Sequence, residues 1–213
     1  MIATIIGSTG LTGSFLVRQL LADSAITKVM SVSRRPLNIS NSKLTEVLIS
    51  DFADLPTIQS KIPGELYFCC LGTTIKAAGS KENFEKVDHA AIVDFARAAK
   101  VHDAKSFTLV SAMGANANSM LFYNCVKGRT EDDVKALELR SLIIFRPALL
   151  VGPRTKFRLG ERLVTKTIAP LSRLFPTRIQ MSLITKAETL AMRMLAAGKA
   201  APPGIHIIVA KEI

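Results

Sequence analysis

The stretch Ile2-Ala3-Thr4-Ile5-Ile6-Gly7-Ser8-Thr9-Gly10-Leu11-Thr12-Gly13 decides the fold. Its β-branched apolar run predicts a strand over residues 2–6, and three glycines follow at the spacing G-x-x-G-x-x-G. The amphipathic run after them predicts a helix over residues 11–22. This order of strand, tight turn and helix presents backbone N–H groups at the positive end of a helix dipole, where a pyrophosphate binds.

Each glycine of this turn has its own predicted task. Gly7 allows the tight turn out of the strand, Gly10 lets the backbone approach the phosphates, and Gly13 lets the helix pack closely on the strand. The spacing alone also fits a βα turn that binds no ligand, but the flanking strand and helix favour a dinucleotide site. The predicted cofactor-binding turn comprises Gly7, Ser8, Thr9, Gly10, Leu11, Thr12 and Gly13.

The composition is that of one globular domain. With 213 residues, the chain is expected to form a single domain over residues 1–213. Its hydrophobic fraction of 48% against 21% charged residues excludes a disordered chain. No apolar run reaches the ~18 residues needed to span a bilayer, and the first residues lack the basic region of a signal peptide. The expectation is an intracellular, soluble protein located in the cytoplasm.

Cysteine usage and charge restrict the classes of ligand. Cys69, Cys70 and Cys125 make a poor disulfide framework, and no spacing of cysteine and histidine suits a metal, so no metal site is predicted. The formal net charge of +11 indicates an anionic partner, which leaves open nucleic acid, acidic lipid headgroups or a phosphorylated small molecule.

Strand and helix patterns alternate along the chain. Strands are predicted over residues 2–6, 28–33, 44–49, 65–71, 106–111, 142–145 and 205–209. Helices are predicted over residues 11–22, 54–60, 81–100, 120–139 and 188–197. This alternation predicts an α/β protein with a doubly wound, mostly parallel Rossmann sheet of about seven strands and helices on both faces. Ligands of such sheets bind outside the carboxyl ends of the strands, so the residues that follow each strand carry the chemistry.

The second strand ends in Ser33-Arg34-Arg35. A carboxylate at this position accepts hydrogen bonds from the ribose of NAD, whereas a guanidinium suits the additional 2′-phosphate of NADP. Arg34 and Arg35 therefore favour NADP(H) over NAD(H), with two solvated surface arginines as the alternative.

Two further strand ends supply predicted cofactor-binding residues. Asp51 follows the third strand, where it can reach the adenine or act as a helix N-cap. Leu71, Gly72 and Thr73 end the fourth strand, and the missing Cβ of Gly72 lets the chain pass close to the cofactor.

The segment Tyr123-Asn124-Cys125-Val126-Lys127 has the pattern Y-x-x-x-K. On a helix, residues four apart share a face, so the phenol and the ammonium group point the same way. A nearby cation favours the phenolate and makes a tyrosine usable as a general acid/base. Ser111, at the end of the fifth strand, is able to hydrogen-bond the same substrate oxygen. Ser111, Tyr123 and Lys127 are therefore the candidate catalytic residues.

These motifs resemble the short-chain dehydrogenase/reductase superfamily, and the similarity is greatest to its atypical members of the Tat-interacting oxidoreductase-like group. The matching segments are Gly7–Gly13, Ser33–Arg35, Leu109–Ala115, Tyr123–Gly128 and Arg146–Pro153. The resemblance implies that Ser111, Tyr123 and Lys127 are catalytic and that Lys127 also binds the nicotinamide ribose. It implies too that Pro147 begins a segment whose backbone lies beside the nicotinamide.

Two positions depart from the pattern of that superfamily. Val87-Asp88-His89 stands where many relatives carry an asparagine used in proton relay. After Arg146-Pro147 the chain has Ala148, where the glycine of an R-P-G motif is usual. The main hypothesis is an enzyme, an NADP-dependent oxidoreductase that transfers a hydride between the nicotinamide and a small carbonyl or alcohol substrate. The alternative is a catalytically weak NADPH-binding sensor or scaffold that regulates a protein partner.

The last third of the chain is basic. Residues 154–178 carry seven lysines and arginines against one acid, Glu161, with apolar residues at roughly helical spacing. Residues 151–200 are interpreted as a substrate-covering region whose charges attract an anionic small molecule. Contact with a protein partner or acidic lipid, and a solvated helix over the core, are the alternatives. Specific nucleic-acid binding is not expected, because aromatics are only 6% and no stacking platform is visible. A homodimer is left open.

Overall fold

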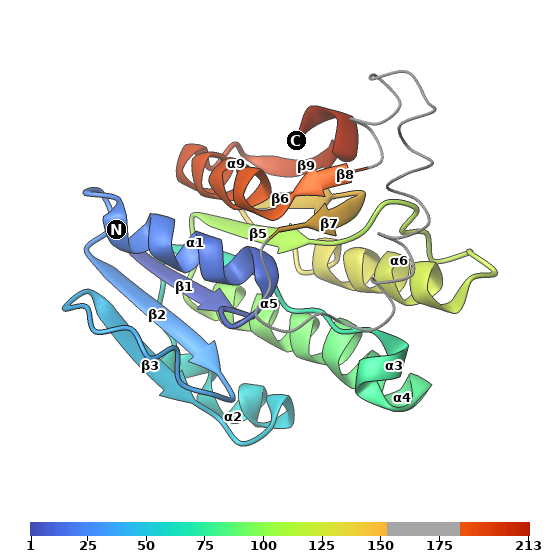
Figure 1. Ribbon diagram of the computed structural model, residues 1–213, viewed down its shortest axis with the longest axis horizontal. Helices are drawn as coiled ribbons and strands as arrows, with labels where there is room; N and C mark the ends of the chain where they lie inside the picture. Colours follow the sequence, from blue (N-terminus) through green and yellow to red (C-terminus); the bar gives the residue numbers. More distant parts are fainter. Residues whose placement is uncertain (153–183) are drawn as a thin grey trace.

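A seven-stranded parallel sheet forms the centre of the protein (Figure 1). The computed structural model describes residues 1–152 and 184–213. The strands lie in the order β3-β2-β1-β4-β5-β6-β9, so the chain winds outward from β1 in both directions, as in a Rossmann sheet. Their bounds are β1 (Ile2–Ile6), β2 (Lys28–Ser33), β3 (Leu44–Leu48), β4 (Leu66–Cys69), β5 (Ser106–Val110), β6 (Ser141–Arg146) and β9 (Gly204–Val209). The predicted fold class is confirmed.

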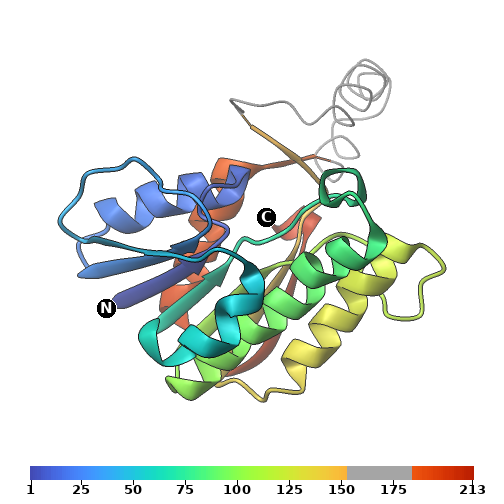
Figure 2. The same ribbon diagram turned by 90° about the horizontal axis from the view of Figure 1, so that it is seen from below.

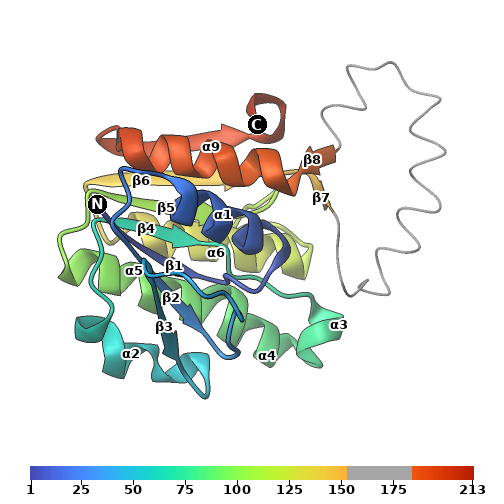
Figure 3. The same ribbon diagram turned by 60° about the vertical axis from the view of Figure 1, so that its left-hand side comes forward.

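Helices cover both faces of this sheet (Figures 2 and 3). The α-helices are α1 (Leu11–Ala22), α2 (Leu55–Ile58), α3 (Ile75–Ala78), α4 (Lys81–Glu85), α5 (Ala91–Val101), α6 (Phe122–Lys135) and α9 (Ala187–Ala200). Short 3₁₀ turns are η1 (Phe52–Asp54), η2 (Gln59–Lys61) and η4 (Ala210–Glu212), and η3 (Lys86–Ala90) is a π-helical turn. Helices α1 and α9 pack together on one face, and α2, α5 and α6 lie on the other.

Two apolar cores, one on each face of the sheet, hold the layers together. In the core under α5, Tyr67 packs against Phe95 and Phe95 against Phe107, with ring centroids 5.3 and 5.9 Å apart. In the core under α1 and α9, Gly198 lets α9 approach the sheet, because a Cβ there would lie 2.7 Å from the ring of Phe68. Such tight interlocking fixes the strand ends relative to one another.

The long helix predicted over residues 81–100 is interrupted. The chain runs through α4, then the π-helical turn η3, and then α5. The extra residue of a π turn leaves backbone groups without their usual partners, and the hydroxyl of Thr130 donates to the carbonyl of Asp88 at 2.8 Å. The carboxyl group of Asp88 is thereby carried into the interior, where it is fully buried.

A small second sheet lies outside the predicted elements. It pairs β7 (Leu149–Val151) in parallel with β8 (Ile184–Lys186). Residues 154–178, the basic segment of the sequence, lie outside the described residues. The end of the 151–200 region forms α9, which packs on α1 and on strands β4 and β5 and so belongs to the core layers.

Candidate active site

The turn after β1 requires glycine at two positions. Gly7 has a positive φ of 78°, and a Cβ there would lie 2.5 Å from the carbonyl carbon and oxygen of Cys70. A Cβ at Gly13 would lie 2.2 Å from the carbonyl oxygen of Gly7. The glycines therefore allow the turn to pack against the end of β4 and α1 to pack against the turn. Thr9 and Gly10 lie exposed between them.

The turn fits a pyrophosphate group. The N-cap of α1, Gly10, has no side chain to satisfy the first backbone N–H groups of the helix. Among the described residues, nothing hydrogen-bonds the buried hydroxyl of Thr12. Ser8 is buried and accepts a hydrogen bond from the hydroxyl of Ser31 at 2.7 Å. Free donors at the positive end of a helix dipole are what an anionic phosphate needs.

Arg34 and Arg35 are both exposed at the carboxyl end of β2. The guanidinium carbon of Arg34 lies 4.6 Å from the centroid of the Phe52 ring, a cation–π contact that orders the side chain. Asp51 is exposed, and its carboxylate caps η1 by accepting from the N–H of Ala53 at 2.9 Å. The structure thus shows the N-cap role that the sequence left open for Asp51.

The loop that follows β4 is joined to α6 through a buried ion pair. Asp88 Oδ1 lies 2.7 Å from Lys127 Nζ, and the side chains of both residues are almost fully buried. The N–H of Thr73 donates to the other oxygen of Asp88 at 2.7 Å. A Cβ on Gly72 would lie 3.4 Å from Asp88 and 3.7 Å from Lys127. The predicted cofactor loop, of which Leu71 is buried, therefore lies directly over the predicted catalytic lysine.

Asp88 keeps Lys127 charged. Burial is the largest single influence and lowers the pKa of Lys127, but attraction to Asp88, the interaction with Tyr123 and the hydrogen bond to Asp88 together outweigh it. The net result is a pKa above the usual value of 10.5. Lys127 is therefore an ammonium ion at neutral pH, and Asp88 offsets part of its charge.

Tyr123 lies in the first turn of α6 and is 37% exposed. Its ring packs against the buried ring of Phe84, with the centroids 5.6 Å apart. Lys127 follows one turn later on the same helix. Next to it, Gly128 lets the loop before α6 cross the helix, because a Cβ there would lie 2.0 Å from the backbone N of Ala117.

Ser111 follows β5 and is buried. Its hydroxyl donates to Glu131 at 2.5 Å, and Arg146 at the end of β6 forms two hydrogen bonds to the same carboxylate. The hydrogen bond raises the pKa of Arg146 above its usual value. Pro147 is buried, and its carbonyl accepts from the N–H of Met113 in the loop after β5.

The sequence did not predict a site role for Asp88, Glu131 or Arg146. Asp88 was singled out only as a departure from the family pattern, and Arg146 only as the first residue of a segment that matches the family. A signal for Glu131 was present, because it lies four residues after Lys127 and extends the pattern to Y-x-x-x-K-x-x-x-E on one helix face.

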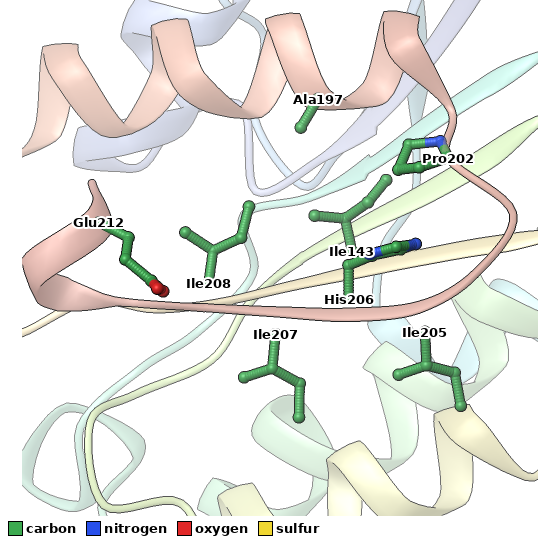
Figure 4. Close-up of a pocket in the computed structure, with 8 residues that line it drawn as sticks. All are labelled: Ile143, Ala197, Pro202, Ile205, His206, Ile207, Ile208 and Glu212. Carbon is green, nitrogen blue, oxygen red and sulfur yellow. The ribbon is translucent and has the colours of Figure 1, made fainter.

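A pocket of about 540 Å³ lies elsewhere, at the outer strand β9 (Figure 4). Ile208 points toward α9, Glu212 reaches back to β9, where it accepts from the N–H of Val209 at 2.9 Å, and Ile205 and Ile207 point to the opposite side of the strand. None of the predicted site residues lines this pocket. The glycine turn offers a recognition surface for an anion, and the buried ion pair offers titratable groups. Together they define the better candidate for an active site.

The described ranges, 1–152 and 184–213, contain no group of three or more histidine, cysteine, aspartate or glutamate side chains placed to hold a metal. They also contain no helix that is both long and apolar enough to cross a bilayer.

This fold and this site define a dinucleotide-binding protein of the Rossmann class. A family described as "NAD(P)H-binding" matches residues 7–173, and the chain belongs to that family. Among curated proteins, it is 42% identical over 158 residues to "Protein FMP52, mitochondrial" of Debaryomyces hansenii, covering 73% of this chain and 70% of that protein. It is 31% identical over 205 residues to "Protein fmp52-1, mitochondrial" of Aspergillus oryzae, covering 94% and 87%.

Solved structures show the same fold at low sequence identity. "MoeE5 in complex with UDP-glucose and NAD" has a TM-score of 0.71 at 16% identity, covering 97% of this chain and 75% of that chain. The Bordetella bronchiseptica enzyme WbmH, in complex with NAD⁺, also has a TM-score of 0.71 at 16% identity, covering 99% and 78%.

The expected cytoplasmic location is wrong. The curated relatives are named as mitochondrial proteins. The expectation rested on the absence of an apolar span and of a secretory signal, and neither feature distinguishes the cytosol from the interior of an organelle.

Proposed function

We propose that the protein is an NADP-dependent oxidoreductase that acts on a small carbonyl or alcohol substrate. The observation that carries the proposal is the buried Lys127, one helical turn after Tyr123 and directly under the predicted cofactor loop at Gly72. Membership of the NAD(P)H-binding family supports the cofactor class. The charged lysine beside a tyrosine supports acid/base chemistry.

Each candidate catalytic residue has one role in this proposal. The cofactor, when bound, would provide the hydride for reduction of the carbonyl carbon as NADPH, or would take up the hydride of the alcohol carbon as NADP⁺. Tyr123 gives its phenolic proton to the carbonyl oxygen in reduction and takes a proton from the alcohol in oxidation. Lys127 stabilises the phenolate by its charge, and Ser111 orients the reacting oxygen.

The preference for NADP rests on the charge at the end of β2. Arg34 and Arg35 are exposed there, and Arg34 is ordered on the ring of Phe52. Guanidinium groups bind phosphate oxygens through two parallel hydrogen bonds. The Ser33-Arg34-Arg35 turn contains no carboxylate that would repel a 2′-phosphate.

Replacing Arg34 and Arg35 together by alanine is expected to weaken NADPH binding by about tenfold or more and NADH binding by about twofold or less. Titration of the bound cofactor by fluorescence measures both affinities. Arg140→Ala is the matched control, because Arg140 precedes β6 and pairs with Asp103 at the opposite end of the sheet. An equal loss for the two cofactors contradicts the NADP assignment.

A second candidate function is an NADPH-dependent sensor with little turnover. The observation that favours it is the contact between Asp88 and Lys127, which directs part of the lysine charge away from the tyrosine. A protein that only holds the cofactor has no need of a charged lysine beside a tyrosine, so the enzyme remains the first proposal.

NADPH oxidation over a panel of aldehydes and ketones separates the two functions. The oxidoreductase is expected to turn over at least one carbonyl compound with NADPH, and more slowly with NADH. Tight NADPH binding measured in the same preparation, without turnover on any member of the panel, contradicts the enzyme and supports the sensor.

A further inference from the structure

Glu131 is a buried carboxylate whose partners lie on two other elements. Its side chain, on α6, is 1% exposed. Oε1 accepts from the Ser111 hydroxyl at 2.5 Å and from Arg146 Nε at 3.0 Å. Oε2 accepts from the terminal nitrogen of Arg146 at 2.6 Å. The ammonium group of Lys135 lies 3.9 Å from the carboxylate and adds a second cation.

This geometry fixes the direction of the hydrogen bond between Ser111 and Glu131. The Arg146 guanidinium carries donors only, so Glu131 accepts both of its bonds as a carboxylate. A carboxylate has no proton to give, and the short contact to Ser111 therefore uses the single hydroxyl proton of the serine. What remains on Ser111 Oγ is two lone pairs.

We propose that Glu131 and Arg146 are positioning residues that make Ser111 a hydrogen-bond acceptor in the reaction. This inference rests on the proposed oxidoreductase function. Ser111 accepts a hydrogen bond from the hydroxyl of an alcohol substrate and has no proton to donate to a carbonyl. A carbonyl oxygen then receives its hydrogen bond from Tyr123 alone. The bound alcohol makes one hydrogen bond more than the bound carbonyl, which is worth about a fivefold difference in affinity.

Two complexes that cannot react measure whether Ser111 acts as a hydrogen-bond acceptor, through the affinities for an alcohol and for an aldehyde. The probes are 4-nitrobenzaldehyde bound with NADP⁺ and 4-nitrobenzyl alcohol bound with NADPH, each titrated in the complete protein. Glu131→Met removes the acceptor at similar side-chain length and frees the serine proton. We expect the variant to bind the aldehyde about fivefold more tightly and the alcohol no more tightly than the wild type.

Three variants control the measurement. In the Ser111→Ala background, Glu131→Met is expected to leave the ratio of the two affinities unchanged, because Glu131 acts through the serine. Glu131→Met/Arg146→Met removes the whole ion pair and replaces the single variant if an unpaired Arg146 prevents folding. Glu85→Met is the surface control, because Glu85 pairs with Arg129 away from Ser111 and its loss should alter neither affinity.

The outcomes distinguish this inference from the function on which it rests. A shift of the ratio toward the aldehyde that disappears without Ser111 supports the inference. An unchanged ratio, or both probes weakened together as a merely structural role requires, overturns the inference and leaves the oxidoreductase intact. Failure of the wild type to turn over any carbonyl in the NADPH screen overturns the proposed function, and this inference with it.

Discussion

Replacing Tyr123 by phenylalanine is expected to lower kcat for carbonyl reduction by about a hundredfold or more, because the substitution removes the only proposed proton donor. The fold and the cofactor site should be retained. The Tyr123 ring packs on Phe84, a contact that phenylalanine preserves, and more than a third of the residue is exposed. NADPH affinity is therefore expected to remain within about twofold, since the hydroxyl contributes at most one hydrogen bond to the complex.

The chain offers a matched control for this substitution. Its other tyrosine, Tyr67, is fully buried in β4 and donates its hydroxyl to the carbonyl of Ile62 at 2.6 Å. Tyr67→Phe removes the same atom outside the site and is expected to lower stability by about 1 kcal/mol while leaving kcat unchanged. Steady-state rates for both variants, on the best carbonyl from the screen, make the comparison. A Tyr123→Phe variant that keeps wild-type turnover excludes the proposed mechanism.

Asp88→Leu is expected to lower the free energy of unfolding by about 3–5 kcal/mol, because it leaves the Lys127 ammonium buried without a partner. The side chains of both residues are almost fully buried, so solvent gives little compensation. Asp88→Leu/Lys127→Met removes both charges and is expected to recover most of the loss. Urea denaturation at neutral pH measures the two variants and the wild type.

A surface ion pair provides the control for the buried one. Asp103 and Arg140 pair at 3.2 Å with both side chains largely exposed, so Asp103→Asn should change stability by less than about 1 kcal/mol. If Asp88→Leu is as stable as the wild type, or if the double variant is no more stable than the single one, the ion pair does not have the role assigned to it.

The pH dependence of the wild type follows from the raised pKa of Lys127. A raised value in the folded state means that the protonated lysine is stabilised by folding. The contribution is complete below the usual value of 10.5 and is lost as the pH rises through the higher folded value. The stability of the wild type should therefore fall above that pH by more than that of Asp88→Leu/Lys127→Met.

Local patterns were sufficient to predict the central sheet. Apolar strand segments, such as those before Gly7 and around Cys69 and Leu109, alternate along the chain with segments whose apolar residues have helical spacing. Each of these patterns is contained within a few residues. The sequence also predicted that the residues following these strands share one edge of the sheet, because parallel strands bring their carboxyl ends to that edge. The three-residue strands β7 and β8 carry no comparable signal, because their pairing joins segments far apart in the sequence.

The ion pairs of the site could not be predicted in this way. Asp88 reaches Lys127 from a π turn that interrupts the helix, and the apolar spacing before and after that turn is typical of one continuous helix. Glu131 reaches Ser111 and Arg146 across two strand ends, a contact that depends on the packing of α6 against the sheet. Side-chain partners of this kind are decided by tertiary packing and leave no periodic pattern.

The π turn at Lys86–Ala90 also makes the length of the chain part of the site. A π turn holds one residue more than an α-helical turn over the same path. A chain shorter by one residue here would run as a regular helix with the flanking turns in place, and the widened turn that holds Asp88 would be lost. The carboxylate that contacts Lys127 and Thr73 is thus specified by the number of residues between Ser80 and Val101 as much as by the identity of Asp88.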